Sequence, residues 1–335
     1  MFMLYPSREE LLKIYSLYWR GLPVATRSDI SPADMPELKS GTHLQILSVL
    51  ARELEGVSPQ PGQTLNVLDV GCGDGLLIAY LTEALPKLFP GVDFALYGFD
   101  VGDHGVQTDG YFDETISLLS QTFPDTRWSD RLALISERDA WPYADGFFAA
   151  TVSNQVLEHV RDHDMFFAET ARVTQTNGVS VHVFPSRHTW IEQHTLVPFA
   201  HRFGQAHRIE AAIRFWSRRG RGRYPEHKRM YPAVTPESYA ERHADYLIRY
   251  TNFQPKRLFL ATAKAHQLHA SFRHSGLYIW EKLRRMRGKS PRYTAPAVPT
   301  FWQRALSLLA PYVTNVTLVT VKSRAYDTPP AEKAG

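Results

Sequence analysis

Three glycines at alternate positions mark the clearest place for chemistry in this chain. Gly71, Gly73 and Gly75 directly follow the apolar run Leu65–Val70, and a second apolar run, Leu76–Leu81, comes straight after them. The first run, interrupted by only two polar residues, predicts a short parallel strand buried on both faces, and the second predicts the start of a helix. Because glycine has no Cβ, backbone N–H groups in such a turn can approach an anionic or polar ligand closely.

The spacing of these glycines separates two classes of cofactor. The dinucleotide-binding fingerprint G-x-G-x-x-G needs a glycine at position 76, where this chain has Leu76. The turn instead reads G-x-G-x-G, and Asp69 stands two residues before it. This pattern resembles the first motif of the class I S-adenosylmethionine (SAM) dependent methyltransferases, D/E-x-G-x-G-x-G. The resemblance implies a SAM site that includes Asp69, Gly71, Gly73 and Gly75.

Cys72 is the only cysteine of the chain, and it lies inside the glycine turn. We expect this small residue to contribute its backbone amide to the cofactor site, with a reactive thiol nucleophile as the alternative. A single cysteine excludes an intramolecular disulfide, which fits a reducing compartment.

A second acidic residue ends the next predicted strand. Phe94–Asp100 is largely apolar, and Asp100 follows Gly75 by 25 residues. A carboxylate at this position can accept hydrogen bonds from both ribose hydroxyls of a nucleoside. The resemblance implies the same role for Asp100 and places Val101 beside the cofactor. The alternatives are that Asp100 only caps a helix or closes a turn, or that Asp103 takes its place.

The segment after the third predicted strand, Arg131–Ser136, resembles the loop that covers the adenine ring in this family. The resemblance implies that the carboxylate of Asp139 accepts a hydrogen bond from the exocyclic amine and that the backbone amide of Ala140 faces the ring. Trp141 is expected to form an apolar wall beside them. Alternatively, Asp139 is only a surface turn residue.

The segment 145–160 resembles the fourth strand of the family and the V-L-E-H-V sequence that follows it. Its polar end predicts that Asn154 and Gln155 lie at the carboxyl edge of the sheet, where open α/β sheets bind ligands, and both are assigned to the cofactor site. His159 comes four residues after Gln155 and would face the same way on a short helix. It could shape the pocket wall, hydrogen-bond the cofactor or act as a general base, and a packing histidine is the alternative.

Histidines and charged residues cluster after the fifth predicted strand, Val179–Pro185. This position predicts that His188, Glu192 and His201 line the acceptor pocket, and it makes His194 a second candidate for the general base. Glu192, His194 and His201 could also form a metal site. Their spacing matches no zinc motif and no cysteine ligand is available, so no metal is expected. Structural, hydrogen-bonded histidines are the remaining alternative.

The order of the predicted elements indicates an α/β protein with a Rossmann-like, doubly wound sheet of seven strands, the last of them antiparallel. N-terminal helices precede the sheet, and a helical cap is inserted after the fifth strand. The predicted divisions are a helical lid (1–60), the SAM-binding core (61–198), a helical cap and acceptor region with the sixth strand (199–300), a final helix and strand (301–323) and a disordered tail (324–335).

Local patterns predict further elements within these divisions. A tight turn is predicted at Asn177 and Gly178. Helices are predicted over Ser7–Arg20, Glu37–Glu55, Thr115–Phe123, Asp162–Val173, Pro236–Tyr250, Pro255–His266, Gly276–Met286 and Phe301–Tyr312, and the last two strands over Gln267–Arg273 and Val313–Val321.

Composition narrows the class of protein. The chain has 335 residues, 44% of them hydrophobic, which is enough for a large α/β domain with additions. The N-terminus lacks the pattern of a signal peptide and no run of eighteen apolar residues occurs, so a cytoplasmic protein without a transmembrane segment is expected.

The balance of 38 basic against 34 acidic residues gives little reason to expect a nucleic-acid partner. The arginine-rich stretch 214–229 is a solvated surface, a site for an anionic acceptor or a nucleic-acid patch.

Taken together, the resemblance implies an enzyme that moves a methyl group from SAM to a polar small molecule. The histidines and arginines after the fifth strand favour O-methylation of a sugar, a glycan intermediate or a secondary metabolite. The alternatives are an RNA or protein methyltransferase and a non-catalytic, methyltransferase-like scaffold subunit. The oligomeric state is left open.

Overall fold

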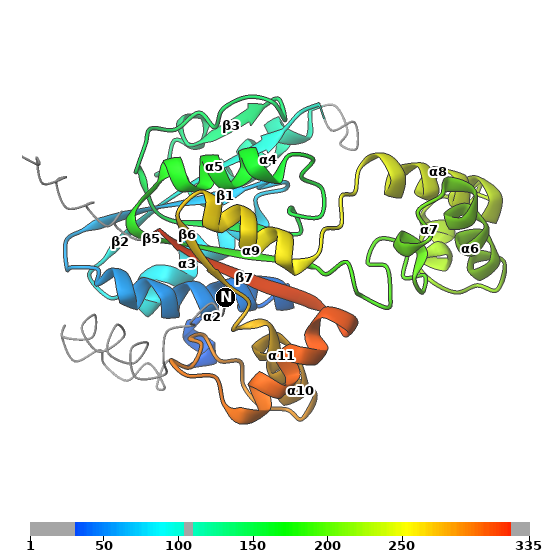
Figure 1. Ribbon diagram of the computed structural model, residues 1–335. Helices are drawn as coiled ribbons and strands as arrows, with labels where there is room; N and C mark the ends of the chain where they lie inside the picture. Colours follow the sequence, from blue (N-terminus) through cyan, green and yellow to red (C-terminus); the bar gives the residue numbers. More distant parts are fainter. Residues whose placement is uncertain (1–30, 104–109, 323–335) are drawn as a thin grey trace, which may run out of the picture.

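Seven strands form one mixed sheet in the order β3-β2-β1-β4-β5-β7-β6 (Figure 1). This computed structural model describes residues 31–103 and 110–322, so the predicted helix Ser7–Arg20 and the predicted tail 324–335 lie outside the described residues. The strands are β1 (Thr64–Val70), β2 (Asp93–Val101), β3 (Leu132–Ile135), β4 (Phe148–Asn154), β5 (Thr174–Pro185), β6 (Leu268–Ser271) and β7 (Asn315–Lys322).

The sheet is doubly wound and its last strand is antiparallel, as predicted. β1 pairs in parallel with β2 on one side and with β4 on the other, so the strand order reverses next to β1. β7 runs antiparallel to both of its neighbours, β5 and β6. In open α/β sheets, a ligand binds outside the carboxyl ends of the strands at the point of reversal. Here that point lies between the turns that follow β1 and β4.

Helices cover both faces of the sheet (Figure 1). α2, α3 and α10 pack on one face, and α5 and α9 pack on the other. The helices are α2 (Gly41–Val57), α3 (Leu76–Leu88), α4 (Tyr111–Thr122), α5 (His163–Val173), α6 (Ala206–Arg218), α7 (Tyr224–Met230), α8 (Pro236–Arg249), α9 (Lys256–Ala265), α10 (Ser275–Met286) and α11 (Phe301–Val313), with short 3-10 turns at Pro32–Asp34, Trp128–Asp130 and Ala200–Arg202.

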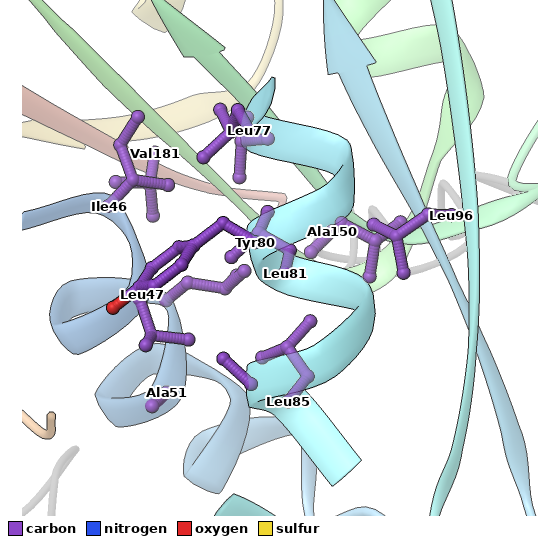
Figure 2. Close-up of a cluster of buried hydrophobic side chains, with 14 of the residues drawn as sticks. Ile46, Leu47, Ala51, Leu77, Tyr80, Leu81, Leu85, Leu96, Ala150 and Val181 are labelled. Carbon is purple, nitrogen blue, oxygen red and sulfur yellow. The ribbon is translucent and has the colours of Figure 1, made fainter. Parts of the chain in front are cut away.

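α2 and α3 lie side by side and fill the first face with aliphatic side chains. Figure 2 shows Leu47 of α2 beside Tyr80 and Leu81 of α3, and the strand residue Val181 next to Ile46 of α2. α2 begins at Gly41 rather than at the predicted Glu37, because the side chain of Ser40 accepts a hydrogen bond from the backbone N–H of Thr42 and caps the helix there.

The predicted tight turn at Asn177 and Gly178 does not separate a helix from a strand, so this part of the prediction is wrong. β5 already begins at Thr174 and runs through both residues, and its register against β4 shifts between Phe148 and Ala150. Asn177 does have the left-handed conformation that the turn prediction assumed, with φ 65°. The conformation therefore produces a bulge inside a long strand instead of ending a helix and starting a strand.

α6 and α8 pack against each other around an apolar cluster of their own, which includes Ile209, Ile213, Tyr239 and Leu247. With α7 they stand to one side of the sheet (Figure 1). α9 was predicted to belong to the same cap, but it packs on α5 and β6 instead. None of the helices in the described ranges is long and apolar enough to cross a bilayer.

Candidate active site

All three glycines of the turn after β1 have left-handed backbone conformations, with φ 69° at Gly71, 51° at Gly73 and 72° at Gly75. The backbone N–H groups of Gly71 and Cys72 both donate to the carbonyl of Phe99, which fixes the turn against β2. A Cβ on Gly71 would lie 2.6 Å from Cγ2 of Val156 in the loop after β4. Any larger residue at Gly71 would therefore separate two loops that lie at the sheet reversal.

Asp100 lies at the end of β2 with its carboxylate against the glycine turn. Its Oδ2 accepts a hydrogen bond of 2.9 Å from the backbone N–H of Gly73, and its Oδ1 accepts one of 2.7 Å from the N–H of Val101. The two predicted cofactor-binding segments are thus adjacent in space. Asp103, the alternative to Asp100, accepts hydrogen bonds from the Ser136 hydroxyl and the Glu137 N–H, so its carboxylate ties together the loops after β2 and β3.

Asp69 is buried in β1, and its Oδ1 has no hydrogen-bond partner within the described structure. Burial, together with the negative charges of Asp100 and Asp74, raises the pKa of Asp69 well above its ordinary value. Burial, with Asp69 and Asp100 adding to it, also raises the pKa of the Cys72 thiol. A thiol that stays protonated is a poor nucleophile, so the structure does not favour the reactive alternative for Cys72.

The loop after β3 presents Asp139 and Ala140 to solvent. The carboxylate of Asp139 accepts a hydrogen bond from the N–H of Ser136, which holds it in a turn. The prediction for Trp141 is wrong: its ring is buried between those of Phe99 and Phe166. Its backbone N–H donates to Glu169, which turns the ring into the core, so that it is not an exposed wall.

The loop after β4 carries Asn154, Gln155 and His159. Oδ1 of Asn154 is buried and has no hydrogen-bond partner among the described residues. The short helix predicted here is a turn at residues 157–159. Gln155 has φ 59°, and its N–H donates to Val183 of β5, so the chain cannot continue from the strand into a helix.

His159 and His194 face each other. Their Nε2 atoms are 3.4 Å apart. Nδ1 of His159 is 2.6 Å from the carbonyl of Tyr250, and Nδ1 of His194 is 2.6 Å from Oε1 of Glu192. Carbonyl and carboxylate oxygens only accept hydrogen bonds, so both Nδ1 atoms must donate. The two Nε2 atoms then point at each other, and one proton can lie between them.

Two buried glutamates flank this imidazole pair. Burial alone would raise the pKa of Glu192, but hydrogen bonds from His194 and Thr195 and the charge of His194 lower it to about 2. Burial, and then the charge of Glu192, raises the pKa of Glu158 to about 8. Glu158 lies 3.9 Å from Nε2 of His159, too far for a hydrogen bond. At neutral pH, Glu192 is therefore the charged partner and Glu158 is protonated.

A cavity of about 500 Å³ lies beside the imidazole pair. It is lined by the loop after β5, including Arg187 and His188, by the turn at His201 and Arg202, and by the end of α8 and the segment after it. His188 and His201, two of the residues predicted for the acceptor pocket, therefore line one cavity. Glu192 does not line it and instead holds His194 in place.

The sequence did not point to the α8 segment of this site. Tyr246 lies 5.1 Å from His194 between ring centroids, and the carbonyl of Tyr250 holds His159 from 91 residues away. Two tyrosines one helical turn apart were the only local signal. No group of three histidine, cysteine or acidic side chains suited to a metal occurs in the described ranges.

These features fit a bound SAM. The nucleoside part would lie over the glycine turn, where a Cβ at Gly71 would force the turn away from Val156. The carboxylate of Asp100, which contacts the N–H of Gly73, would then lie beside it. The unpartnered Oδ1 atoms of Asp69 and Asn154, at the ends of neighbouring strands, would meet polar groups of the cofactor.

Comparison with known proteins agrees with this geometry. The model of a family described as "Methyltransferase domain" matches residues 42–243, more than half of the chain. A curated relative, the ubiquinone biosynthesis O-methyltransferase of Bartonella quintana, is 30% identical over 142 residues, which are 42% of this chain and 49% of the relative. The chain thus spans about half the length of this curated relative.

Solved structures with low sequence identity are also similar. Geranyl diphosphate C-methyltransferase from Streptomyces coelicolor is 14% identical with a TM-score of 0.41, and the match covers 86% of this chain and 80% of that one. A putative sarcosine dimethylglycine methyltransferase from Galdieria sulphuraria is 16% identical with a TM-score of 0.40, covering 82% and 84% of the two chains. Because the family model matches residues 42–243, the chain belongs to the methyltransferase domain family.

Proposed function

We propose that the protein transfers a methyl group from SAM to a hydroxyl group of a polar small molecule, a class that includes sugars, glycan intermediates and secondary metabolites. The observation that carries this proposal is the imidazole pair of His159 and His194 beside the glycine turn. Val156 touches the turn and His159 follows it by three residues, so the pair and the cofactor site share one loop.

We assign the cofactor-binding residues the roles that the resemblance implies. Asp100 accepts hydrogen bonds from the ribose hydroxyls, Asp139 and the N–H of Ala140 meet the adenine edge, and Asn154 and Gln155 border the methionine part. SAM supplies a methyl group activated by its sulfonium. The protein itself has to orient the acceptor in line with that methyl and exclude water.

A hydroxyl acceptor also has to lose its proton as the new C–O bond forms, and the imidazole pair can take it. Nε2 of either ring accepts the proton, and the other Nε2, 3.4 Å away, shares it. The negative charge of Glu192 stabilises the cation that results. The name of the Bartonella quintana relative, an O-methyltransferase, supports the same class of acceptor atom.

Two arginines of the arginine-rich stretch form ion pairs, which weakens the case for RNA or a protein as the acceptor. Arg214 pairs with Glu210, and Arg218 pairs with Glu237 within the same helical unit. These arginines are therefore partly neutralised. The remaining alternative, a non-catalytic scaffold subunit, predicts that SAM does not bind.

Calorimetric titration with S-adenosylhomocysteine, with NAD as control, tests the cofactor half of the proposal. Micromolar binding of S-adenosylhomocysteine alone is expected, and no binding of either compound would favour the scaffold. A screen of hydroxyl compounds with labelled SAM then identifies the acceptor.

The variants His159→Ala and His194→Ala test the base. Each should lower kcat by about 10²- to 10⁴-fold without weakening S-adenosylhomocysteine binding. His266→Ala, which changes the histidine directly after α9 that pairs with Asp164, is the matched control. Full turnover in both active-site variants would show that neither is the base.

A further inference from the structure

The cavity beside the imidazole pair is lined by cations and by no acid. Arg187, Arg202 and two histidines contribute to its wall, and the other lining residues are uncharged. Lys256, at the start of α9, lies close enough for its charge, with those of Arg187 and Arg202, to lower the pKa of His188, which burial lowers first. The histidine stays neutral, so the positive potential comes from the arginines and the lysine.

These cations lack counterions in the described structure. No carboxylate in residues 31–103 and 110–322 forms an ion pair with Arg187, Arg202 or Lys256. The guanidinium of Arg202 donates to the carbonyl of His188 and lies 5.1 Å from the Phe199 ring centroid, and the ammonium of Lys256 lies 4.7 Å from that of Phe272. Aromatic rings hold both groups, and neither is neutralised.

The cavity and the imidazole pair share one segment of chain. The backbone N–H of Asn252, which lines the cavity, donates to the carbonyl of Glu158, and the carbonyl of Tyr250 holds His159. A molecule anchored in the cavity would therefore lie next to the proposed base.

We propose that this cavity binds an anionic group, a phosphate or a carboxylate, of the methyl acceptor, and that Arg187 and Arg202 recognise it. The assignment of this anionic group to the methyl acceptor rests on the proposed function, whereas anion binding to the cavity can be tested alone. Guanidinium groups form bidentate, charge-assisted hydrogen bonds with both kinds of anion.

The test is calorimetric titration of the full chain with inorganic pyrophosphate and, separately, with malonate, which distinguishes phosphate from carboxylate. The variants Arg187→Gln and Arg202→Gln should each lower the affinity for the preferred anion by about tenfold. Arg218→Gln changes an arginine that is already paired with Glu237, and it should leave the affinity for the anion unchanged.

S-adenosylhomocysteine binding, measured on the same samples, separates the two proposals. Two results would show that the anion site is wrong while the proposed function stands. In the first, S-adenosylhomocysteine binds but neither anion does. In the second, S-adenosylhomocysteine binds and the anions bind the Arg187 and Arg202 variants as tightly as wild type. If an anion binds through these arginines while S-adenosylhomocysteine does not bind, the site stands and the proposed function fails.

A separate feature, the outer face of α11, carries a second inference. Phe301, Trp302 and Leu308 are 74%, 63% and 79% exposed, and Leu309 and Tyr312 continue the same stripe along the helix. The residues that α11 buries include Gln303 and Ala310. An amphipathic helix of a soluble domain normally turns its apolar stripe inward, so this helix is oriented the opposite way.

The surroundings of this stripe are strongly basic. α10 packs against α11, and α10 with the loop after it exposes cations at Lys282, Arg285, Arg287, Lys289 and Arg292. Residues 282–322 contain eight lysines and arginines and no acidic residue. In Figure 1, α10 and α11 lie together at one end of the molecule, away from α6, α7 and α8.

We infer that this basic, apolar face, formed by α10 and α11, docks on the surface of an anionic lipid bilayer. Exposed tryptophan, phenylalanine and leucine side chains enter the interface between head groups and acyl chains, while lysines and arginines bind anionic head groups. A second copy of the chain fits this face poorly, because a symmetric dimer would bring the same cations together.

Flotation with vesicles tests the docking face. The full chain should bind vesicles that contain phosphatidylglycerol and should dissociate from them as the salt concentration rises. It should bind vesicles of pure phosphatidylcholine at least tenfold more weakly. The triple variant Phe301→Ser, Trp302→Ser, Leu308→Ser should lose binding. The matched control, Met230→Ser with Tyr231→Ser, changes equally exposed side chains near the end of α7 and should retain it.

Three results would overturn this inference: no binding to anionic vesicles, equal binding by the triple variant, or a dimer in solution that the triple variant abolishes. The last result would assign the face to a second copy. Circular dichroism of the triple variant shows that a loss of binding does not come from unfolding.

Discussion

Glu158 and Glu192 are both buried beside the imidazole pair, yet their surroundings shift their pKa values in opposite directions, to about 8 and about 2. Glu192 accepts hydrogen bonds from the backbone and side chain of both His194 and Thr195. No hydrogen bond reaches the carboxyl oxygens of Glu158 in the described structure. One carboxyl group is therefore held charged, and the other is held neutral.

This difference predicts opposite pH dependences of stability for two variants. The pKa of Glu192 falls from 4.5 to about 2 on folding, so its contribution is present above about pH 4.5 and is lost as the pH falls toward 2. Glu192→Gln should lower the free energy of unfolding by about 2 kcal/mol at pH 7, and by less at pH 3.

Glu158→Gln should behave in the reverse way. Its raised pKa makes wild type lose stability as the pH rises from about 4.5 to 8, because the unfolded state ionises first. The glutamine variant avoids that loss and should gain stability over wild type between pH 5 and pH 8. Urea unfolding of both variants and wild type from pH 3 to pH 8 provides the measurement, and parallel pH profiles would contradict the assignment.

Asp100 is the residue whose loss should most affect the cofactor. Asp100→Ala should weaken S-adenosylhomocysteine binding by about tenfold to a hundredfold, because two hydrogen bonds to a charged acceptor are lost. Asp103→Ala removes a carboxylate that binds Ser136 and Glu137, so it should weaken binding less. Titration calorimetry compares the two. A larger effect from Asp103→Ala would show that the ribose assignment is wrong.

At the scale of elements, the turn after β1 depends on contact with the loop after β4. Gly71→Ala places a methyl group 2.6 Å from Val156 and also requires a left-handed alanine. It should lower the free energy of unfolding by about 3 kcal/mol, through overpacking and backbone strain together.

Gly62→Ala is the matched control, because Gly62 has φ 78° but a Cβ added there would meet no atom within 4 Å. It should cost only the backbone part, about 1 kcal/mol. Chemical denaturation measures both values. Equal losses would mean that Val156 moves away without cost.

Elements with a strong local pattern could be predicted from the sequence, whereas those set by tertiary contacts could not. The β1 turn, α5 and β7 follow from periodicity and glycine spacing. The turn after β4 depends on the bond from Gln155 to Val183, and the burial of Trp141 depends on Glu169. The site shows the same division. The glycine turn is evident in the sequence, but the contact of His159 with Tyr250 spans 91 residues and leaves no local trace.

At the scale of the whole molecule, the site lies between two packed units. The sheet and its helices supply the cofactor-binding turns, and α6 and α8, with their own apolar cluster, support the side of the cavity formed by the end of α8. The loop after β5 also touches α11, since Trp190 donates to the carbonyl of Tyr312. The proposed docking face thus borders the segment that lines the acceptor cavity.

A cavity made by mutation in the apolar cluster of α6 and α8 should destabilise only that unit. Ile213→Ala should speed hydrogen exchange in α6 and α8 and leave β1 and β4 protected, because Ile213 is buried among residues of that unit alone. Leu50→Ala, in the main core, should instead speed exchange in the sheet. Mass spectrometry of exchanged peptides measures both. Uniform loss of protection in Ile213→Ala would mean that the two units open together.

β7 has a consequence for how the chain is made. This strand lies between β5 and β6, and its Thr320 contacts Ser180 across 140 positions of sequence. During synthesis on the ribosome, β5 emerges long before the strand that joins it to β6, and β6 emerges shortly before that strand. Each then presents an unpaired edge until residues 315–322 leave the exit tunnel. The β5 edge of the nascent chain is thus exposed to chaperone capture or to strand exchange with a neighbouring chain while residues 186–314 are made.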